Sequence, residues 1–166
     1  DKESTNYILQ TVYTLNKSMD DAKAETALSI LALRNAALRT CILYENIEKP
    51  HQVVLRERKL EYTRIDFSAM EKEQSEIALQ KCLSEDVKKG FDLQRDPLMR
   101  VIHILLPSGE EKMVWTMHHI IADGWCFTIL KEQFIEIYEC LMNGVSENEL
   151  KAKAVSEKKE KGEYSE

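Results

Sequence analysis

The stretch Met117-His118-His119-Ile120-Ile121-Ala122-Asp123-Gly124-Trp125 organises the chain. Residues 113–117 form an apolar run before it, and apolar residues at helical spacing follow it to residue 141. The Asp-Gly pair inside the stretch is a turn signal. The pattern predicts a strand, a loop and a helix, with polar side chains collected at the junction. Junction loops on a rigid scaffold commonly carry functional residues.

Composition and charge exclude several classes of function. The 166 residues, 43% of them hydrophobic and 31% charged, suit one globular domain with a core. A formal net charge of -6 argues against nucleic-acid binding, which needs an excess of Lys and Arg. No apolar run approaches the roughly 18 residues of a membrane span. Residues 1–4 are too polar to open a signal peptide, so the sequence predicts a cytoplasmic protein with no membrane partner.

The four cysteines, Cys41, Cys82, Cys126 and Cys140, contain no C-x-x-C pair. This spacing argues against a zinc site and against a disulfide framework. Three of them lie in apolar patterns and are predicted to be buried free thiols. Cys126 is close to the histidines, which leaves a catalytic thiol as a minor alternative.

The first half of the chain predicts four strands and one helix. Residues 7–15 alternate in the manner of a strand, and Ser18 or Asp20 can cap a helix that runs to about residue 34. Residues 38–44 are apolar and β-prone and predict a further strand. Residues 52–56 and 60–65 predict two short strands, paired as a hairpin or at a sheet edge.

The second half has clearer boundaries. Ser68-Ala69-Met70-Glu71 fits a capping box and predicts a helix that Gly90 ends, with Ile77, Leu83 and Val87 on its apolar side. Residues 98–106 and 112–118 form a hairpin. The helix after the junction ends at Asn143-Gly144. From residue 147 the mixed Lys and Glu predict a solvated helix or a disordered tail.

The histidine pair admits two interpretations. In an extended strand His119 shares a face with Trp115 and Met117, and His118 points the other way, so a metal site that uses both is not expected. His119 can then face a cavity and exchange protons near neutral pH. Asp123 can cap the following helix, and Gly124 allows a ligand to come close. The plainer alternative is a core histidine followed by an ordinary cap.

The junction resembles the H-H-x-x-x-D-G signature of the condensation domains of nonribosomal peptide synthetases. The longer form M-H-H-x-I-S-D-G-W-S also fits, except that Ala122 and Cys126 replace serines. Residues 34–42 are similar to R-H-E-x-L-R-T-x-F and keep both arginines, the leucine and the threonine, but lose the histidine, the glutamate and the aromatic residue. Residues 91–100 look like F-D-L…P-L-x-R. The resemblance covers residues 7–144. Other acyltransferases, such as chloramphenicol acetyltransferase, share only H-x-x-x-D-G.

The resemblance implies roles for the motif residues. His119 would be the catalytic histidine, beside the acceptor amine as it attacks the donor thioester. It would either remove a proton or orient the amine and stabilise the tetrahedral intermediate. Asp123 would be structural and pair with Arg39. Gly124 would turn its N–H toward the thioester, and His118 would pack or form hydrogen bonds. Trp125 belongs to the motif without an assigned chemical role.

The resemblance also implies the architecture and the partners. The fold would be α/β, an α+β sandwich: a chloramphenicol acetyltransferase-like half-domain with a mixed, mostly antiparallel sheet and helices packed on it. Residues 1–146 would be the N-terminal subdomain of a condensation domain. Residues 147–166 would be a charged tail or the start of a linker to a missing C-terminal subdomain, because the motifs of that second half are absent.

Three functions follow as alternatives. The first is amide-bond formation between acyl and aminoacyl thioesters on carrier-protein domains. The substrates would be carried on phosphopantetheine, and this chain would bind no cofactor. No activity is expected without the second subdomain. An epimerisation subtype shares the signature, whereas the heterocyclisation signature is replaced here. The second is a non-catalytic module that docks a carrier protein or a partner half, with self-association through an exposed half-interface. The third is a freestanding acyltransferase that uses coenzyme A thioesters.

Overall fold

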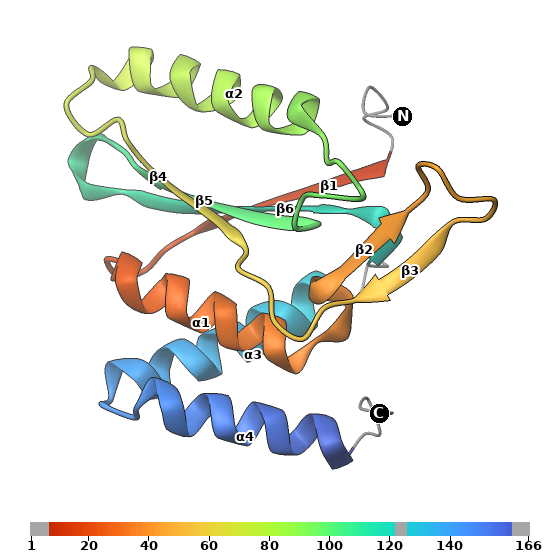
Figure 1. The fold of residues 1–166 in the computed structure, drawn as a ribbon. Coiled ribbons are helices and arrows are strands. Elements are labelled where there is room, and N and C mark those ends of the chain that lie inside the picture. The colour runs from red at the N-terminus through yellow and green to blue at the C-terminus, as the bar shows by residue number, and fades with distance from the viewer. Residues whose placement is uncertain (1–6, 122–125, 161–166) are drawn as a thin grey trace.

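A four-stranded sheet lies at the centre of the molecule (Figure 1). The computed structural model describes residues 7–121 and 126–160. The strand order is β1-β6-β5-β4, with bounds Ile8–Thr14 for β1, Glu111–His118 for β6, Met99–Leu105 for β5 and Glu61–Asp66 for β4. The β1–β6 and β6–β5 pairs are antiparallel, and the β4–β5 pair is parallel. The predicted mixed, mostly antiparallel sheet is therefore confirmed.

Helices cover both faces of this sheet. Helices α1 (Asp21–Arg34) and α3 (Cys126–Met142) pack on one face, and α2 (Lys72–Lys89) covers the other (Figure 1). The larger core lies between the sheet and the α1–α3 layer and contains Trp115, Leu31 and Phe134. A smaller core beneath α2 contains Leu79 and Ile104. Because both faces of β5 are covered, its first six residues are all buried.

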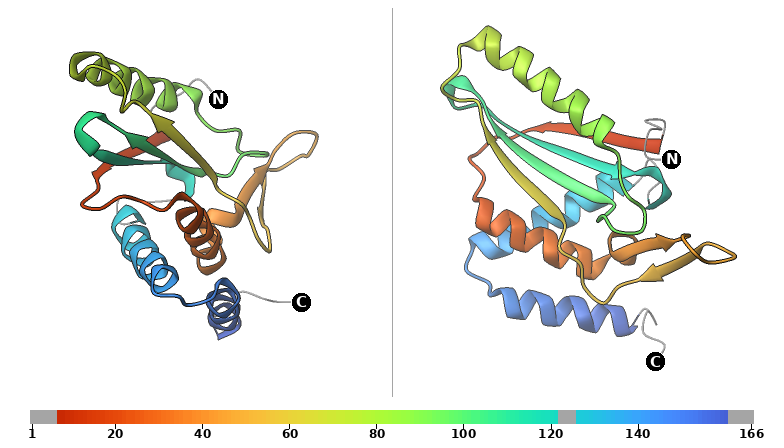
Figure 2. Two further views of the ribbon diagram at one scale, coloured as in Figure 1. Left: turned by 90° about the vertical axis from the view of Figure 1, so that its left-hand side faces the viewer. Right: turned by 45° about the horizontal axis from the view of Figure 1, so that its top comes forward.

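The other two strands form a separate ribbon. Strands β2 (Thr40–Leu43) and β3 (His51–Val54) pair with each other and project from one side of the molecule (Figure 2). The expected pairing of residues 52–56 with 60–65 is wrong. Tyr62 packs against the larger core and Ile65 against the smaller one, and only a strand beside β5 reaches both.

The helices begin and end at most, but not all, of the predicted capping residues. The Asp20 carboxylate accepts the Lys23 N–H at 3.1 Å and caps α1 as predicted. Gly90, with φ of 61°, ends α2, and Gly144, with φ of 88°, follows α3. The capping box is wrong, because Asp66 accepts both the N–H and the hydroxyl of Ser68 and draws that residue into a turn. Helix α2 then begins only at Lys72.

Two further expectations on burial are corrected. Ile77, predicted on the apolar side of α2, is 71% exposed, and Leu79 is buried instead. The region after residue 147 forms helix α4 (Glu147–Glu160), but it is neither disordered nor simply solvated. Ala154 is buried and Leu150 packs against the larger core beside α1. The domain boundary at residue 146 stays a prediction.

The described cysteines carry free thiols: Cys41 is buried, and Cys82 and Cys140 are half-buried. Within the described ranges no group of His, Cys, Asp and Glu has the arrangement of a metal site. The same part of the chain contains no helix that is long and apolar enough to cross a membrane.

Candidate active site

The two histidines lie at the end of the central strand β6. The strand ends at His118, and His119 begins a single 3-10 turn, His119–Ile121. The turn breaks the alternation of a strand, so His119 does not continue on the face of Trp115 and Met117. Both histidines line one cavity of about 440 Å³. The prediction that they point opposite ways is therefore wrong.

Segments far apart in the sequence form this cavity. They come from the start of β1, the end of β2, the loop after α2 and the turn after β6. The lining residues are Tyr7, Tyr44, Phe91, Leu93, His118, His119 and Ile120. Sequence reasoning did not single out the two tyrosines as site residues. Phe91 and Leu93 did carry a signal, because they belong to the F-D-L segment.

His118 is held by two aromatic rings and one hydrogen bond. Its ring stacks on Tyr7, with centroids 6.1 Å apart, and meets Phe91 edge-on at 6.3 Å. Its Nδ1 accepts the Ile120 N–H at 3.0 Å. Burial, and to a lesser degree the nearby charge of His119, lower the pKa of His118 below its usual range. His118 is therefore a neutral imidazole at neutral pH, whereas His119 is exposed in the cavity.

Arg39 lies in the 3-10 turn Ala36–Arg39 that joins α1 to β2. It is 3% exposed, and its guanidinium donates to the Ala32 carbonyl at 2.7 Å and the Leu55 carbonyl at 2.6 Å. These bonds tie the end of α1 to the segment after β3. The predicted pairing of Arg39 with Asp123 stays a prediction. The predictions for Ala122, Asp123, Gly124, Trp125 and the Cys126 side chain all lie outside the described residues.

Arg34, the other arginine of the upstream motif, does not reach the cavity. Its guanidinium lies 3.8 Å from Glu136 and 3.5 Å from Glu157. Of the two arginines of the motif, Arg39 is therefore buried in the turn after α1, and Arg34 forms ion pairs that join α1 to α3 and α4.

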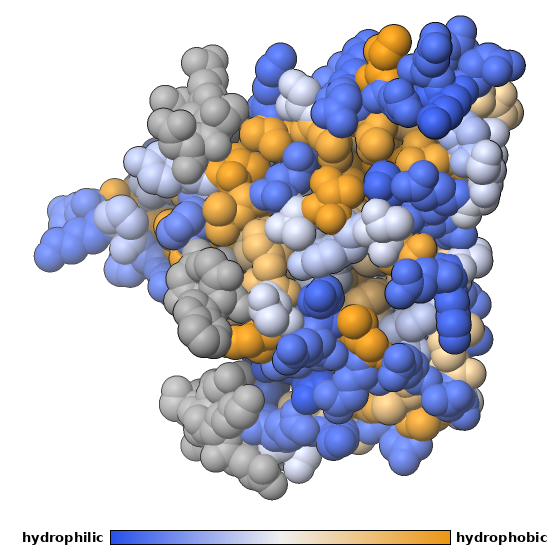
Figure 3. Space-filling model, turned by 180° about the vertical axis from the view of Figure 1, so that it is seen from behind, coloured by the Kyte–Doolittle hydropathy of each residue, from blue (hydrophilic) through white to orange (hydrophobic). Residues whose placement is uncertain are grey.

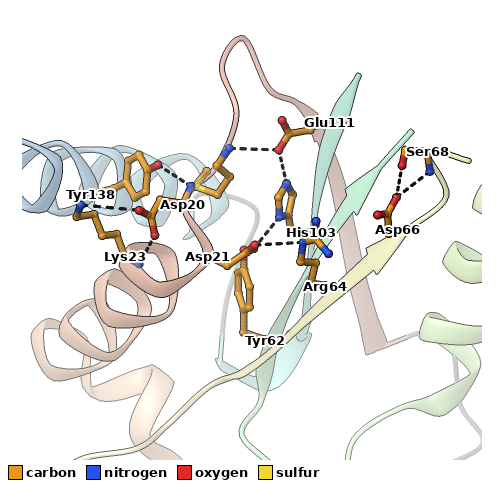
Figure 4. Close-up of polar contacts among 11 residues, drawn as sticks. Asp20, Asp21, Lys23, Tyr62, Arg64, Asp66, Ser68, His103, Glu111 and Tyr138 are labelled. Carbon is orange, nitrogen blue, oxygen red and sulfur yellow. Dashed lines mark hydrogen bonds and ion pairs between the residues drawn. The ribbon is translucent and has the colours of Figure 1, made fainter. Parts of the chain in front are cut away.

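A second polar cluster surrounds His103 on β5 (Figure 4). Its Nδ1 lies 2.7 Å from Asp21, at the start of α1, and its Nε2 lies 2.6 Å from Glu111. Tyr62 and Arg64 reach Asp21 from β4. His103 is 1% exposed, and its bonds to Asp21 and Glu111 join α1 to the sheet.

Both carboxylates of this cluster are stabilised as anions. Burial by itself would raise their pKa values, but hydrogen bonds outweigh it. Those from Tyr62 and His103 lower the pKa of Asp21. Those from the Met19 N–H and His103 lower the pKa of Glu111. The cluster thus contributes stability that depends on ionised carboxylates.

Solved structures share this fold. The first condensation domain of the calcium-dependent antibiotic synthetase, in complex with substrate analogue 2a, superposes with a TM-score of 0.75 at 21% identity, over 88% of this chain and 35% of that chain. The starter condensation domain of the rhizomide synthetase gives a TM-score of 0.76 at 18% identity, over 87% of this chain and 36% of the other. The fold is that of the N-terminal part of a condensation domain, which confirms the predicted fold class.

Sequence relatives establish the family. The chain is 35% identical over 144 residues to bacitracin synthase 3 of Bacillus licheniformis, covering 87% of this chain and 2% of that protein. It is 36% identical over 138 residues to gramicidin S synthase 2 of Brevibacillus brevis, covering 83% and 3%. The condensation domain family model matches residues 1–162, and the chain belongs to that family, whose members form amide bonds. It spans only a few per cent of these synthetases and about a third of the solved domains.

Proposed function

We propose that the chain is the N-terminal subdomain of a condensation domain that joins carrier-bound acyl and aminoacyl thioesters through an amide bond. The single observation that carries this proposal is the exposed His119 imidazole in a cavity of about 440 Å³ that His118 also lines. A neutral His118 adds no positive charge that would repel an amine as it becomes cationic during attack.

In the proposed reaction the acceptor amine attacks the carbonyl carbon of the donor thioester. The new C–N bond gives a tetrahedral intermediate, which collapses with loss of the phosphopantetheine thiolate. The proton of the amine leaves through His119, or His119 orients the amine while the proton passes directly to the thiolate. Gly124 would support the developing oxyanion with its N–H, and Asp123 would hold Arg39; both roles stay predictions.

The proposed site is incomplete without a second subdomain. A condensation reaction needs a closed channel, because water competes with the amine for the thioester. The cavity beside His119 opens to solvent, and the chain matches only about a third of the solved domains. We therefore propose that the chain alone is inactive, and that carrier-protein domains and the C-terminal subdomain are its partners.

The test is a condensation assay on a domain in which this chain is followed by a C-terminal subdomain. Donor and acceptor carrier proteins are loaded, and the peptide product is measured by mass spectrometry. His119→Ala is expected to lower the rate about 100-fold or more, the range of general acid–base catalysis. The matched control is His51→Ala, an exposed histidine on β3 outside the cavity. Wild-type turnover by His119→Ala contradicts the proposal.

One observation favours a non-catalytic docking module as a second candidate. Figure 3 shows apolar side chains gathered in the middle of one face, between α2 and the helices below the sheet. In the described part of the chain β1 pairs only with β6, and its Val12 is 39% exposed. Dimers in analytical ultracentrifugation, with no condensation after the second subdomain is restored, would favour this candidate.

The third candidate, a coenzyme A-dependent acyltransferase, can be distinguished from the other two by the substrate that it uses. One solved relative, a starter condensation domain of the rhizomide synthetase, was crystallised in complex with C8-CoA. Turnover of an acyl coenzyme A with a free amine, without any carrier protein, would favour this activity for the chain.

A further inference from the structure

Phe91 links a buried arginine to the histidine pair. It follows Gly90 at the end of α2 and is 5% exposed. The guanidinium carbon of Arg100 lies 4.2 Å from the centroid of the Phe91 ring, over its face. The same ring meets His118 edge-on, at 6.3 Å and 77°. One side of Phe91 therefore contacts a cation, and another contacts the imidazole at the cavity.

The guanidinium of Arg100 is fixed in its plane. Its Nε donates to the Asp86 carboxylate at 2.7 Å, and its Nη1 donates to the Gly90 carbonyl at 2.7 Å. Its Nη2 donates to the backbone carbonyl of Asp86. Arg100 and Asp86 are both buried, at 3% and 7% exposure. A planar cation with three directed bonds gives the Phe91 ring a rigid support, which a flexible lysine cannot provide.

The Asp86 carboxylate is in turn anchored to the sheet. Its other oxygen accepts hydrogen bonds from Thr116 on β6 and from Gln10 on β1. The position of Arg100 is therefore set by α2 and by the same strand, β6, that ends at His118. Movement of the arginine relative to the histidine pair would break bonds on both elements.

A hydrogen bond joins His118 to the turn that contains His119. The His118 Nδ1 accepts the N–H of Ile120, the central residue of the turn His119–Ile121. An imidazole accepts at Nδ1 only when that nitrogen carries no proton. The ring is therefore in the tautomer with its proton on Nε2, and the same ring contacts Tyr7 and Phe91.

We propose that Arg100, held by Asp86, is a positioning residue for His119 that acts through Phe91 and His118. Arg100 is 3% exposed and does not line the histidine cavity; it lines a second cavity, of about 490 Å³, formed by residues of α2, β4 and β5. The inference rests on the proposed function in one respect: it takes His119 to be the reacting residue. The chain of contacts from Arg100 to the turn does not depend on that assignment.

The first test measures the histidine pair on this chain without substrate. Imidazole ¹⁵N NMR spectra report the tautomer of His118 and the midpoint of its titration. Phe91→Leu keeps an apolar side chain but removes the ring, and Arg100→Lys keeps the charge but removes the planar support. Both variants are expected to move the His118 midpoint to higher pH, because the ring becomes more solvated, and to weaken the Nε2–H tautomer signature.

Leu79→Ala is the matched control. Leu79 lies on α2, the helix that also carries Asp86, and its side chain is buried in the smaller core. It is expected to lower the free energy of unfolding without changing the His118 titration. An unchanged midpoint in Phe91→Leu overturns the inference. An equal shift in Leu79→Ala also overturns it, because general loosening would then explain the effect.

The second test uses the condensation assay. Arg100→Lys is expected to lower kcat about tenfold with little change in KM, since misplacement of a catalytic group costs rate rather than binding. A shifted His118 midpoint with wild-type kcat would overturn the positioning role. If His119→Ala retained full activity, the proposed function would fail, while the NMR result would still decide whether Arg100 positions the turn.

Discussion

Removal of the Asp86 carboxylate gives the sharpest stability prediction. In Asp86→Ala the buried Arg100 keeps only carbonyl acceptors, and Thr116 and Gln10 lose a charged partner. Breaking a buried ion pair by removing one member costs about 3–5 kcal/mol. This is a large fraction of the roughly 5–15 kcal/mol that stabilises a typical domain.

The assay is urea unfolding followed by tryptophan fluorescence, because Trp115 is buried in the larger core. With a slope of about 2 kcal/mol per molar urea, the midpoint should fall by about 2 M. Glu61→Ala is the matched control: its carboxylate pairs with Lys89 at 2.7 Å, near the same end of α2, but at the surface. Its loss should cost about 0–1 kcal/mol.

A double replacement separates pairing from simple loss of volume. Asp86→Leu combined with Arg100→Met removes both charges, so no buried charge is left alone, and the double variant should be more stable than Asp86→Ala. Costs of the two single replacements should not add, because the groups are in contact. A cost below about 1 kcal/mol for Asp86→Ala, or strict additivity, would refute the account of the Arg100 network.

Four further outcomes are expected. The pKa values of Asp21 and Glu111, the two carboxyl groups beside His103, are lowered in the folded chain. The stability that they contribute is therefore complete above about pH 5 and is lost as the pH falls through the folded-state pKa values. His103→Leu removes the group between them and should move the acid-unfolding midpoint, followed by circular dichroism, to higher pH; an unchanged midpoint would contradict this. Tyr62→Phe loses a hydrogen bond to an ionised carboxylate and should cost about 1.5 kcal/mol in urea unfolding. Ala154→Asp buries an unpaired charge between α4 and the core and should destabilise the chain strongly, whereas the exposed Ala152→Asp should not; equal effects would show that α4 does not pack. Arg39→Ala should lower the free energy of unfolding by about 3–5 kcal/mol, and an unchanged Tm would contradict the prediction that this buried guanidinium has a charged partner.

Local patterns predicted most of the elements. The alternation of β1 and of the β5–β6 hairpin, the cap at Asp20 and the stop at Gly90 all follow from neighbours within one or two turns, and all are confirmed. The capping box at Ser68 failed for an equally local reason, since Asp66 competes for the same backbone N–H and hydroxyl. The spacing of a motif does not show which of two nearby acceptors a serine will bond to.

The sequence alone determined the family signature, the strand–turn–helix junction and His119 as the residue to test. Tertiary structure decided what surrounds that residue. Strand β6 ends at His118, His119 begins a 3-10 turn, and both histidines line one cavity. His118 contacts Tyr7 and Phe91, and the Arg100 guanidinium lies over the Phe91 ring. These residues come from the start of β1, the loop after α2 and strand β5, so they meet only in the folded chain. Periodicity reports which face a residue occupies within its own element, whereas contacts between elements depend on register and helix placement, which are properties of the whole fold.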